Sequence, residues 1–179
     1  MTLADSDAIS MTHSLDEFSH TLRDDRHRRA FAYWRSKTPE GRLPGRRHID
    51  PLDVPDLLPW LTLIDVVWEQ ERLRLRCRLV GTGVAARFGR DITGLYAEEA
   101  YPEAYLAQAL DTYGAIIGSR SPQLSRHRIP IEGREHAEYD RLILPLAADG
   151  DTVDMFLSCF AFDVGRSEWS SATVPEKTI

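Results

Sequence analysis

Arginine stands at every second position of residues 72–78, and leucine or cysteine fills the positions between. Successive side chains of a β-strand point to opposite faces of its sheet, so this period of two predicts a strand with one charged and one apolar face. Residues 61–68, LTLIDVVW, also have a strand pattern, and a short polar segment around Gln70 and Glu71 separates the two. We therefore predict a β-hairpin that turns at these two residues.

The position of the turn fixes which residues of this hairpin lie opposite each other. The register pairs Glu69 with Arg72, Val67 with Arg74, Asp65 with Arg76 and Leu63 with Arg78. Two of the four arginines thereby gain a carboxylate across the strands. The other face collects Ile64, Val66, Trp68, Leu73, Leu75 and Cys77. We interpret the arginine stripe as the outward face of the hairpin, and an anion-binding site is the alternative.

A helix is predicted over residues 14–37. Its first residues, SLDE, have the S-x-x-E spacing of a capping box, which marks a helix start. The centre of the helix, RDDRHRR, is too charged for a core element, so we expect the helix to lie across a sheet or against a second subunit. Residues 38–60, with five prolines, are predicted to form an extended connecting loop around a short turn of helix near residues 55–58.

The second half of the chain predicts helices followed by three strands. A short helix is expected over residues 84–88, a longer one over 102–117 and a strand over 123–131. Asp149 and Gly150 are a turn signal between the last two strands. Pairing Ala148 with Asp151 places Leu142, Leu144, Leu146, Val153, Met155 and Leu157 on one face, and Tyr139, Arg141, Ile143, Phe156 and Phe160 on the other. This order makes an α+β pattern with one antiparallel sheet.

Composition narrows the function classes. The formal charge is -6, from 22 Lys and Arg against 28 Asp and Glu, whereas general nucleic-acid binders are usually basic. The N-terminal residues lack the pattern of a signal peptide, and no run has the length of a membrane span. We therefore expect a cytoplasmic protein with no nucleic-acid or membrane partner. Cys77 and Cys159 form no C-x-x-C motif and have no histidines at ligand spacing, so neither a disulfide nor a metal site is predicted.

Three blocks of sequence, in this order, carry a family resemblance: LPGRRHIDPLDVPDLLPWLTLIDV, CRLVGTGVAARFGRDITGLY and RLILPLAADGDTVDMFLS. Together they resemble a bacterial PAS-type family that is common in alphaproteobacteria, and the similarity runs from Ala30 to Asp163. The resemblance implies a five-stranded antiparallel sheet of order 2-1-5-4-3, with helices that enclose a ligand space on its concave face. In that order the arginine strand lies at an edge, where charge discourages aggregation between sheets.

The resemblance also implies a domain organisation and a function. Together with the sequence patterns above, it predicts flexible tails over 1–13 and 164–179, an N-terminal helix over 14–37, a connecting loop over 38–60 and a PAS core over 61–163. PAS domains sense and signal through small-molecule binding, subunit contact or both. Because no kinase, cyclase or DNA-binding segment is attached, we expect a stand-alone sensory module that signals through an unidentified partner protein.

The cofactor is left unknown. A photoactive flavin site would need its cysteine in an NCRFLQ-like helix, whereas Cys77 begins the strand motif CRLV. Haem would need an axial histidine on the long helix, and residues 102–118 contain none. His127 and His136, on or beside the third predicted strand, are expected to be ordinary surface histidines.

No enzymatic activity is predicted. Cys159 and Asp140 face each other in the last predicted hairpin, but no histidine has a clear path to them, and the motifs of nucleotide-binding enzymes are missing. One alternative is a small cone-shaped α+β enzyme that uses the same cavity, with Asp140, Tyr105 or a histidine as acid or base. Another is a ligand-free dimerisation adaptor with a filled core.

Two groups of functional residues are predicted. The pocket is expected to be mainly apolar and lined by Cys77, Leu79, Tyr105, Leu144, Met155 and Cys159, with Tyr96 near its mouth. The N-terminal helix is expected to cover the outer face of the last hairpin and to build a homodimer. The residues of this packing are Leu15, Phe18, Leu22, Phe31 and Trp34 of the helix, with Phe156 and Phe160 of the hairpin.

Overall fold

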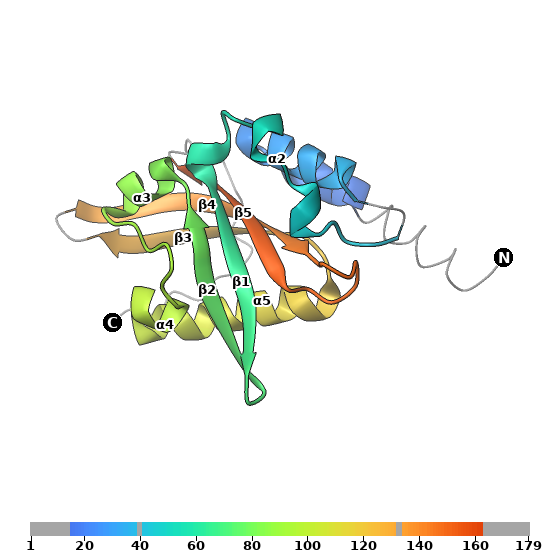
Figure 1. Ribbon diagram of the computed structural model, residues 1–179. Helices are drawn as coiled ribbons and strands as arrows, with labels where there is room; N and C mark the ends of the chain where they lie inside the picture. The colour runs from blue at the N-terminus through green and yellow to red at the C-terminus, as the bar shows by residue number, and fades with distance from the viewer. Residues whose placement is uncertain (1–14, 39–40, 132–133, 163–179) are drawn as a thin grey trace.

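Five strands form one antiparallel sheet in the order β2-β1-β5-β4-β3, as predicted (Figure 1). The computed structural model describes residues 15–38, 41–131 and 134–162. The strands are β1 (Leu61–Glu69), β2 (Arg72–Val80), β3 (Gln123–Ile131), β4 (Arg134–Leu146) and β5 (Met155–Phe162). The first and the last strand of the sequence, β1 and β5, pair in the middle of the sheet, so the two predicted hairpins build one continuous surface.

The β1–β2 hairpin has the predicted register over most of its length. Glu69 pairs with Arg72, and Asp65 pairs with Arg76. Both turn residues, 70–71, take positive φ angles, of 48° and 66°. Positive φ at two successive turn residues is the geometry that matches the twist of a tight hairpin.

A β-bulge between Leu63 and Ile64 shifts the far end of this register. Leu63 pairs with Leu79, so the predicted pairing of Leu63 with Arg78 is wrong. Arg78 instead donates a hydrogen bond from Nε to the Asp65 carboxylate at 2.9 Å. The bulge adds one residue to β2 and leaves the charged side chains on the outward face.

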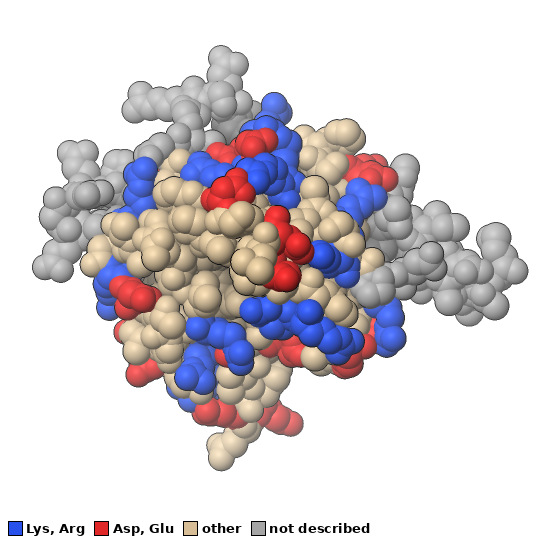
Figure 2. Space-filling view, turned by 45° about the horizontal axis from the view of Figure 1, so that its top comes forward, with Lys and Arg blue, Asp and Glu red and all other residues tan. Residues whose placement is uncertain are grey.

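The arginine stripe of β2 is largely paired with acidic side chains. Arg74 forms an ion pair with Glu69 at 2.7 Å and another with Glu98. Its guanidinium carbon lies 3.7 Å from the ring centroid of Tyr96. Figure 2 shows basic and acidic side chains interspersed over the visible face of the molecule. These contacts support the interpretation of the stripe as the charged outer face of an edge strand.

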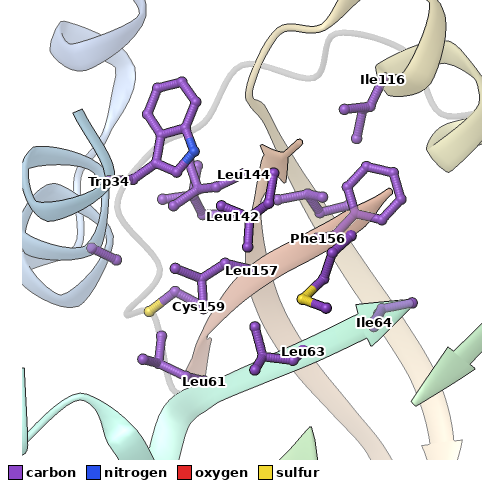
Figure 3. Close-up of a cluster of buried hydrophobic side chains, with 14 of the residues drawn as sticks. Trp34, Leu61, Leu63, Ile64, Ile116, Leu142, Leu144, Phe156, Leu157 and Cys159 are labelled. Atoms are coloured by element: carbon purple, nitrogen blue, oxygen red, sulfur yellow. The ribbon is translucent and has the colours of Figure 1, made fainter. Parts of the chain in front are cut away.

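Helices cover both faces of the sheet. The helices α3 (Thr82–Phe88), α4 (Ala97–Ala100) and α5 (Glu103–Ser119) lie over one face, and α2 (Asp25–Ser36) lies over the other. Tyr113 of α5 packs on Phe156 with ring centroids 4.7 Å apart. On the opposite face, Trp34 of α2 donates from Nε1 to the Pro145 carbonyl oxygen at 2.9 Å. Figure 3 shows Trp34 to one side of β4 and β5 and Ile116 of α5 to the other.

The helix expected over residues 14–37 is divided into two segments. Residues 15–21 are helical, the chain then leaves the helix at Leu22, and α2 begins after Asp24. The Asp24 carboxylate accepts a hydrogen bond from the Arg26 backbone N–H at 2.9 Å. Such an N-cap satisfies a backbone donor at the start of a new helix, which is why the chain breaks here. Residue 14 lies outside the described residues.

In the β4–β5 hairpin the same residues share a face as predicted, but the two faces are exchanged. The set predicted to line the pocket lies under α2, and the set predicted to pack against the N-terminal helix faces the cavity. Leu146 pairs with Met155, two residues away from the predicted register. A shift of two leaves every side chain on its own face, because the side-chain period of a strand is two. The set that contains Leu142, Leu144, Leu157 and Cys159 packs under α2, and the set that contains Tyr139, Arg141, Ile143, Phe156 and Phe160 faces α3 and α5.

The sequence pattern could not distinguish these two placements. All eight residues of β5 are buried, so the strand has no solvent-facing side to orient it. A central strand with helices on both faces is apolar on both, and alternation then sorts residues into two groups without assigning either group to a layer. The prediction that Leu144 and Met155 share a face with Leu75 and Cys77 is therefore wrong.

Residues 41–60 of the proline-rich segment contain more local structure than the single short turn that was predicted. The segment contains three short 3-10 turns: Arg46–His48, Pro51–Asp53 and Leu58–Trp60. Leu43 donates its backbone N–H to the Gly150 carbonyl oxygen at 2.9 Å, and Ala147 donates to the Pro44 carbonyl oxygen at 3.0 Å. These bonds tie the segment to the loop between β4 and β5.

Candidate ligand cavity

A cavity of about 450 Å³ lies between the sheet and the helices α3, α4 and α5. Small-molecule sites typically have volumes in this range and combine an apolar lining with a few polar anchors. The residues around this cavity are Thr62, Ile64, Leu75, Cys77, Val80, Val84, Phe88, Arg90, Ile92, Ala97, Ala100, Tyr101, Pro102, Tyr105, Gln108, Ala109, Thr112, Tyr113, His127, Tyr139, Arg141 and Phe160.

Aromatic rings form the apolar end of the cavity. Phe88 at the end of α3 packs edge-on against Tyr139 and Phe160, with ring centroids 5.3 and 5.9 Å apart. The glycines of the GTG motif place α3 for this contact, because a Cβ on Gly81 would come within 2.4 Å of the Pro59 carbonyl oxygen. Gly81 and Gly83 are thus explained by close packing where the chain enters α3.

The polar end of the cavity contains a buried arginine. The Arg141 side chain extends from β4 on the cavity face, and the residue is only 7% exposed. Its guanidinium carbon lies 5.3 Å from the Tyr113 ring centroid. Its Nε–H has no hydrogen-bond partner among the described residues. The neighbouring Asp140 projects to the opposite face, where it is held by Arg126 at 2.7 Å.

Three hydroxyl groups on this face also lack hydrogen-bond partners within the described part of the chain: those of Thr62, Tyr113 and Ser158. Burial raises the pKa of Tyr113, and the Ser158 hydroxyl partly offsets that rise. Buried polar groups are normally paired with protein or with another hydrogen-bonding molecule. Thr62 and Tyr113 line the cavity together with Arg141, and these groups form the polar part of the site.

The tyrosines around Arg141 are neutral at physiological pH. Burial raises the pKa of Tyr139 to about 12 and also raises the pKa of Tyr101 and Tyr113. Neutral phenols donate hydrogen bonds but bring no negative charge. None of these three groups can therefore act as the counter-ion of Arg141.

His127 is neutral as well. Its ring stacks on Tyr139 at 5.1 Å between centroids, and its Nε2 lies 2.8 Å from the Ser125 hydroxyl oxygen. Burial and then the charge of Arg141 lower the pKa of His127 to about 3. His127 is thus a half-buried polar contact of the cavity, which corrects its expected surface position. The side chain of His136 lies outside the described residues.

Both cysteines are buried thiols. Burial raises the pKa of Cys77, which lines the cavity, to about 11, and raises the pKa of Cys159, which lies under α2, to about 12. Nucleophilic cysteines have lowered pKa values because the thiolate is the reactive form. The burial of Cys77 and Cys159 instead raises their pKa values, so both stay in the protonated thiol form at physiological pH.

The structure brings only part of the predicted pocket together. Cys77 and Tyr105 line the cavity, whereas the other five predicted residues do not: Leu79, Tyr96, Leu144, Met155 and Cys159. Leu79 is 44% exposed on the arginine face, and the ring of Tyr96 lies under the Arg74 guanidinium. Leu144, Met155 and Cys159 lie on the face of the sheet that α2 covers. The inverted placement of the β4–β5 hairpin explains most of this difference.

Sequence analysis missed the residues that give the cavity its chemistry. Arg141, Tyr113, Tyr139 and His127 were not assigned to the pocket, although Arg141 carried a signal. It is the one charged residue in the otherwise apolar run RLILPL, within a predicted strand. A charged residue inside a buried strand indicates a functional or paired group, because burial of a charge is costly.

The residues predicted for dimerisation lie inside one protomer. Phe31 is 3% exposed and Trp34 is 1% exposed, and both pack in the core that α2 forms with the sheet. Leu15 and Leu22 are also buried in this cluster, and Phe18 packs against Phe31 at 5.4 Å. The other two residues, Phe156 and Phe160, belong to the cavity side of the sheet rather than to the packing of α2.

The sheet order and the cavity define a sensory and signalling fold. The chain belongs to the PAS domain family, whose family model matches residues 22–161. No curated protein matches the chain. None of the described helices has the length and apolar character that a membrane crossing requires. Within the described ranges, no group of three or more His, Cys, Asp or Glu side chains is placed to hold a metal ion.

Three solved structures are similar in fold. The LOV protein of Rhodobacter sphaeroides is 17% identical over 66% of this chain and 70% of its own, with a TM-score of 0.47. A point variant of RsLOV is 19% identical, with a TM-score of 0.45, and the match covers 60% of this chain and 61% of that chain. A sensory box histidine kinase/response regulator from Burkholderia thailandensis is 12% identical over 62% of this chain and 81% of that chain, with a TM-score of 0.38. The family assignment depends on the family model and not on these matches.

Proposed function

We propose that this PAS domain is a sensory module that binds a small molecule in the cavity between its sheet and helices α3 to α5. The observation that carries the proposal is the pairing of an apolar cavity of about 450 Å³ with a buried polar end around Arg141. A filled structural core would not be expected to bury an arginine and hydroxyl groups that lack partners among the described residues. These groups favour a sensor over a ligand-free adaptor.

The central strands connect the cavity with α2. Arg141 pairs with Phe160 across β4 and β5 on the cavity face, and the next pair, Leu142 with Cys159, faces α2. The Cys159 carbonyl oxygen lies 3.2 Å from Nε2 of the buried His27 in α2. A ligand that moves Arg141 thus acts on strands whose opposite face carries α2. We propose that the partner protein reads this change at α2.

The cavity residues support binding rather than catalysis. The Cys77 thiol stays protonated, and Asp140 projects away from the cavity into an ion pair with Arg126. Tyr105 is the residue of the enzymatic alternative that does line the cavity. An acid or base would need a second group to activate it, and the neighbouring His127 has its pKa lowered to about 3. We therefore place the enzyme second.

Self-association, a cytoplasmic location and the lack of nucleic-acid partners stay predictions. Because Phe31 and Trp34 are buried within the protomer, a homodimer would have to use other residues. Trp68 at 57% exposure and Leu52 at 81% are the most exposed large apolar side chains of the described residues. A comparison of the sedimentation of wild-type protein and Trp68→Asp tests whether a dimer uses the tip of the β1–β2 hairpin.

Native mass spectrometry of freshly purified protein tests the proposed function. Ala109 of α5 lines the cavity, so Ala109→Phe should fill it and displace a retained molecule. Ala107, exposed on the same helix, provides the matched control Ala107→Phe. We expect a bound small molecule on wild type and on Ala107→Phe, and its loss from Ala109→Phe. Wild-type protein that carries no molecule, and that no compound of a broad library stabilises, would contradict the sensor.

A further inference from the structure

We infer that the cavity ligand is a small organic carboxylate, with its charged group on Arg141 and an aromatic or aliphatic body against the apolar end. This inference rests on the proposed function and names the ligand class for the same cavity. It starts from one observation, a buried cation without a counter-ion among the described residues. Each group around that cation is considered in turn below.

Among the residues that the structure describes, no group supplies the negative charge that Arg141 needs. The neighbouring carboxylate, Asp140, is on the other face and is held by Arg126. None of the cavity-lining residues is aspartate or glutamate, and the second cation of the lining, Arg90, donates to the Ala100 carbonyl oxygen. In a chain of formal charge -6, the lining is therefore positive. A buried guanidinium is stable when a bound anion neutralises it.

The Tyr113 ring accounts for only part of the Arg141 environment. A cation over an aromatic face is stabilised by the ring, and the 5.3 Å separation fits that interaction. The ring gives no acceptor for the N–H groups, and Nε–H remains without one in the described part of the chain. Because Arg141 lines the cavity, an acceptor bound there can contact its guanidinium and supply what the ring does not.

The donors beside Arg141 suit a carboxylate. A carboxylate accepts two parallel hydrogen bonds from the planar edge of one guanidinium. The hydroxyls of Thr62 and Tyr113, which line the cavity and lack partners in the described chain, can donate to the remaining lone pairs. A phosphate carries more charge and usually engages several cations or a run of backbone N–H groups. A carboxylate carries a single negative charge, which one buried arginine and neutral hydroxyl groups can match.

The rest of the lining selects the body of the ligand. The lining combines aliphatic and aromatic groups, among them Val84, Phe88 and Ala97, with neutral polar side chains such as Gln108 and Thr112. Arg90, its other cation, already donates to the Ala100 carbonyl oxygen, so Arg141 is left to neutralise a single carboxylate. The ligand is accordingly a monocarboxylate with one apolar body, and the volume of about 450 Å³ limits that body to a single ring or a short chain.

Thermal shift and calorimetry with matched compounds test the inference on the full chain. The probes are 3-phenylpropionate and hexanoate, each beside its neutral amide and its amine, with inorganic phosphate and phenyl phosphate as further anions. We expect the carboxylates to raise the melting temperature and to bind at least about tenfold more tightly than the amides, the difference expected for a charged, bidentate contact. The amines should not bind.

Arg141 variants locate the binding. Arg141→Met should remove carboxylate binding and raise the melting temperature of the ligand-free protein, because it replaces an uncompensated buried charge with an apolar side chain of similar length. Arg141→Lys should bind more weakly than wild type, since the ammonium cannot make the bidentate contact. The control is Arg78→Gln, an exposed arginine of β2 that pairs with Asp65 outside the cavity. This control should bind like wild type.

A measurement on wild-type protein keeps the test independent of folding defects in the variants. A carboxylate on Arg141 would offset the charge that helps to lower the pKa of His127, so binding should raise that pKa in an NMR titration. Equal binding of amides and carboxylates, or binding of phosphates alone, would overturn the carboxylate and leave the sensor intact. Failure of every probe, together with an empty protein in mass spectrometry, would contradict both.

Discussion

The attachment of α2 to the sheet should depend strongly on Trp34. Its side chain is 1% exposed, stacks on Phe31 at 5.9 Å and donates to the Pro145 carbonyl oxygen at 2.9 Å. Replacing a buried tryptophan with alanine typically costs about 3–5 kcal/mol, so Trp34→Ala should lose a large part of the roughly 5–15 kcal/mol that stabilises a domain. Trp34→Phe keeps a ring but loses the N–H, and should lose about 1–2 kcal/mol.

Urea denaturation followed by far-ultraviolet circular dichroism measures these losses without relying on tryptophan fluorescence. The matched control is Trp68→Ala, because Trp68 is 57% exposed on β1 and its loss should cost less than about 1 kcal/mol. If Trp34→Ala changed the free energy of unfolding no more than Trp68→Ala, the packing of α2 on β4 and β5 would not be the interaction that stabilises this face.

Buried titratable groups give two further predictions. Burial, and after it Arg141, lowers the pKa of His127 from 6.5 to about 3, so the unfolded chain binds the proton first as pH falls. At pH values below about 6.5 the free energy of unfolding should then decrease, by up to about 1.4 kcal/mol per pH unit for this group. In urea titrations His127→Gln should show a smaller decrease than wild type. Equal decreases in the two proteins would contradict this prediction. Burial raises the pKa of Cys77 to about 11 and of Cys159 to about 12. At about pH 8 a disulfide reagent should therefore react at least about 100-fold more slowly with native than with urea-unfolded protein, and rapid modification of either native thiol would count against it.

Sequence patterns were sufficient for the strands and for most of the β1–β2 register, and the family resemblance supplied the order of the sheet. The two-residue turn after Glu69 sets the β1–β2 register, and the charged alternation of β2 orients it, because one face is wet. The bulge at Leu63 has no mark in the sequence, since neither glycine nor another special residue occurs there. The break in the N-terminal helix did have a mark in the sequence, because aspartate is a favoured N-cap residue and Asp24 lies within the charged centre of the expected helix.

The cavity was harder to predict for a physical reason. Both faces of β4 and β5 are apolar, so the assignment of each face depends on where α2 and α5 dock, which is tertiary information. Leu144 and Cys159 therefore resemble pocket residues as closely as Ile143 and Phe160 do. Arg141 is the residue that distinguishes the two faces, because a buried arginine without a carboxylate partner among the described residues favours a face that adjoins a cavity.

Chemical-shift mapping in solution tests the account most directly. On addition of 3-phenylpropionate to ¹⁵N-labelled protein, we predict shifts at cavity residues such as Cys77, Tyr139 and Arg141, and a second set at His27 on the opposite side of the sheet. The second set is the signal that the pairing of Leu142 with Cys159 should transmit to α2. Shifts confined to the exposed residues of the β1–β2 hairpin, with the cavity residues unchanged, would contradict both the site and the route.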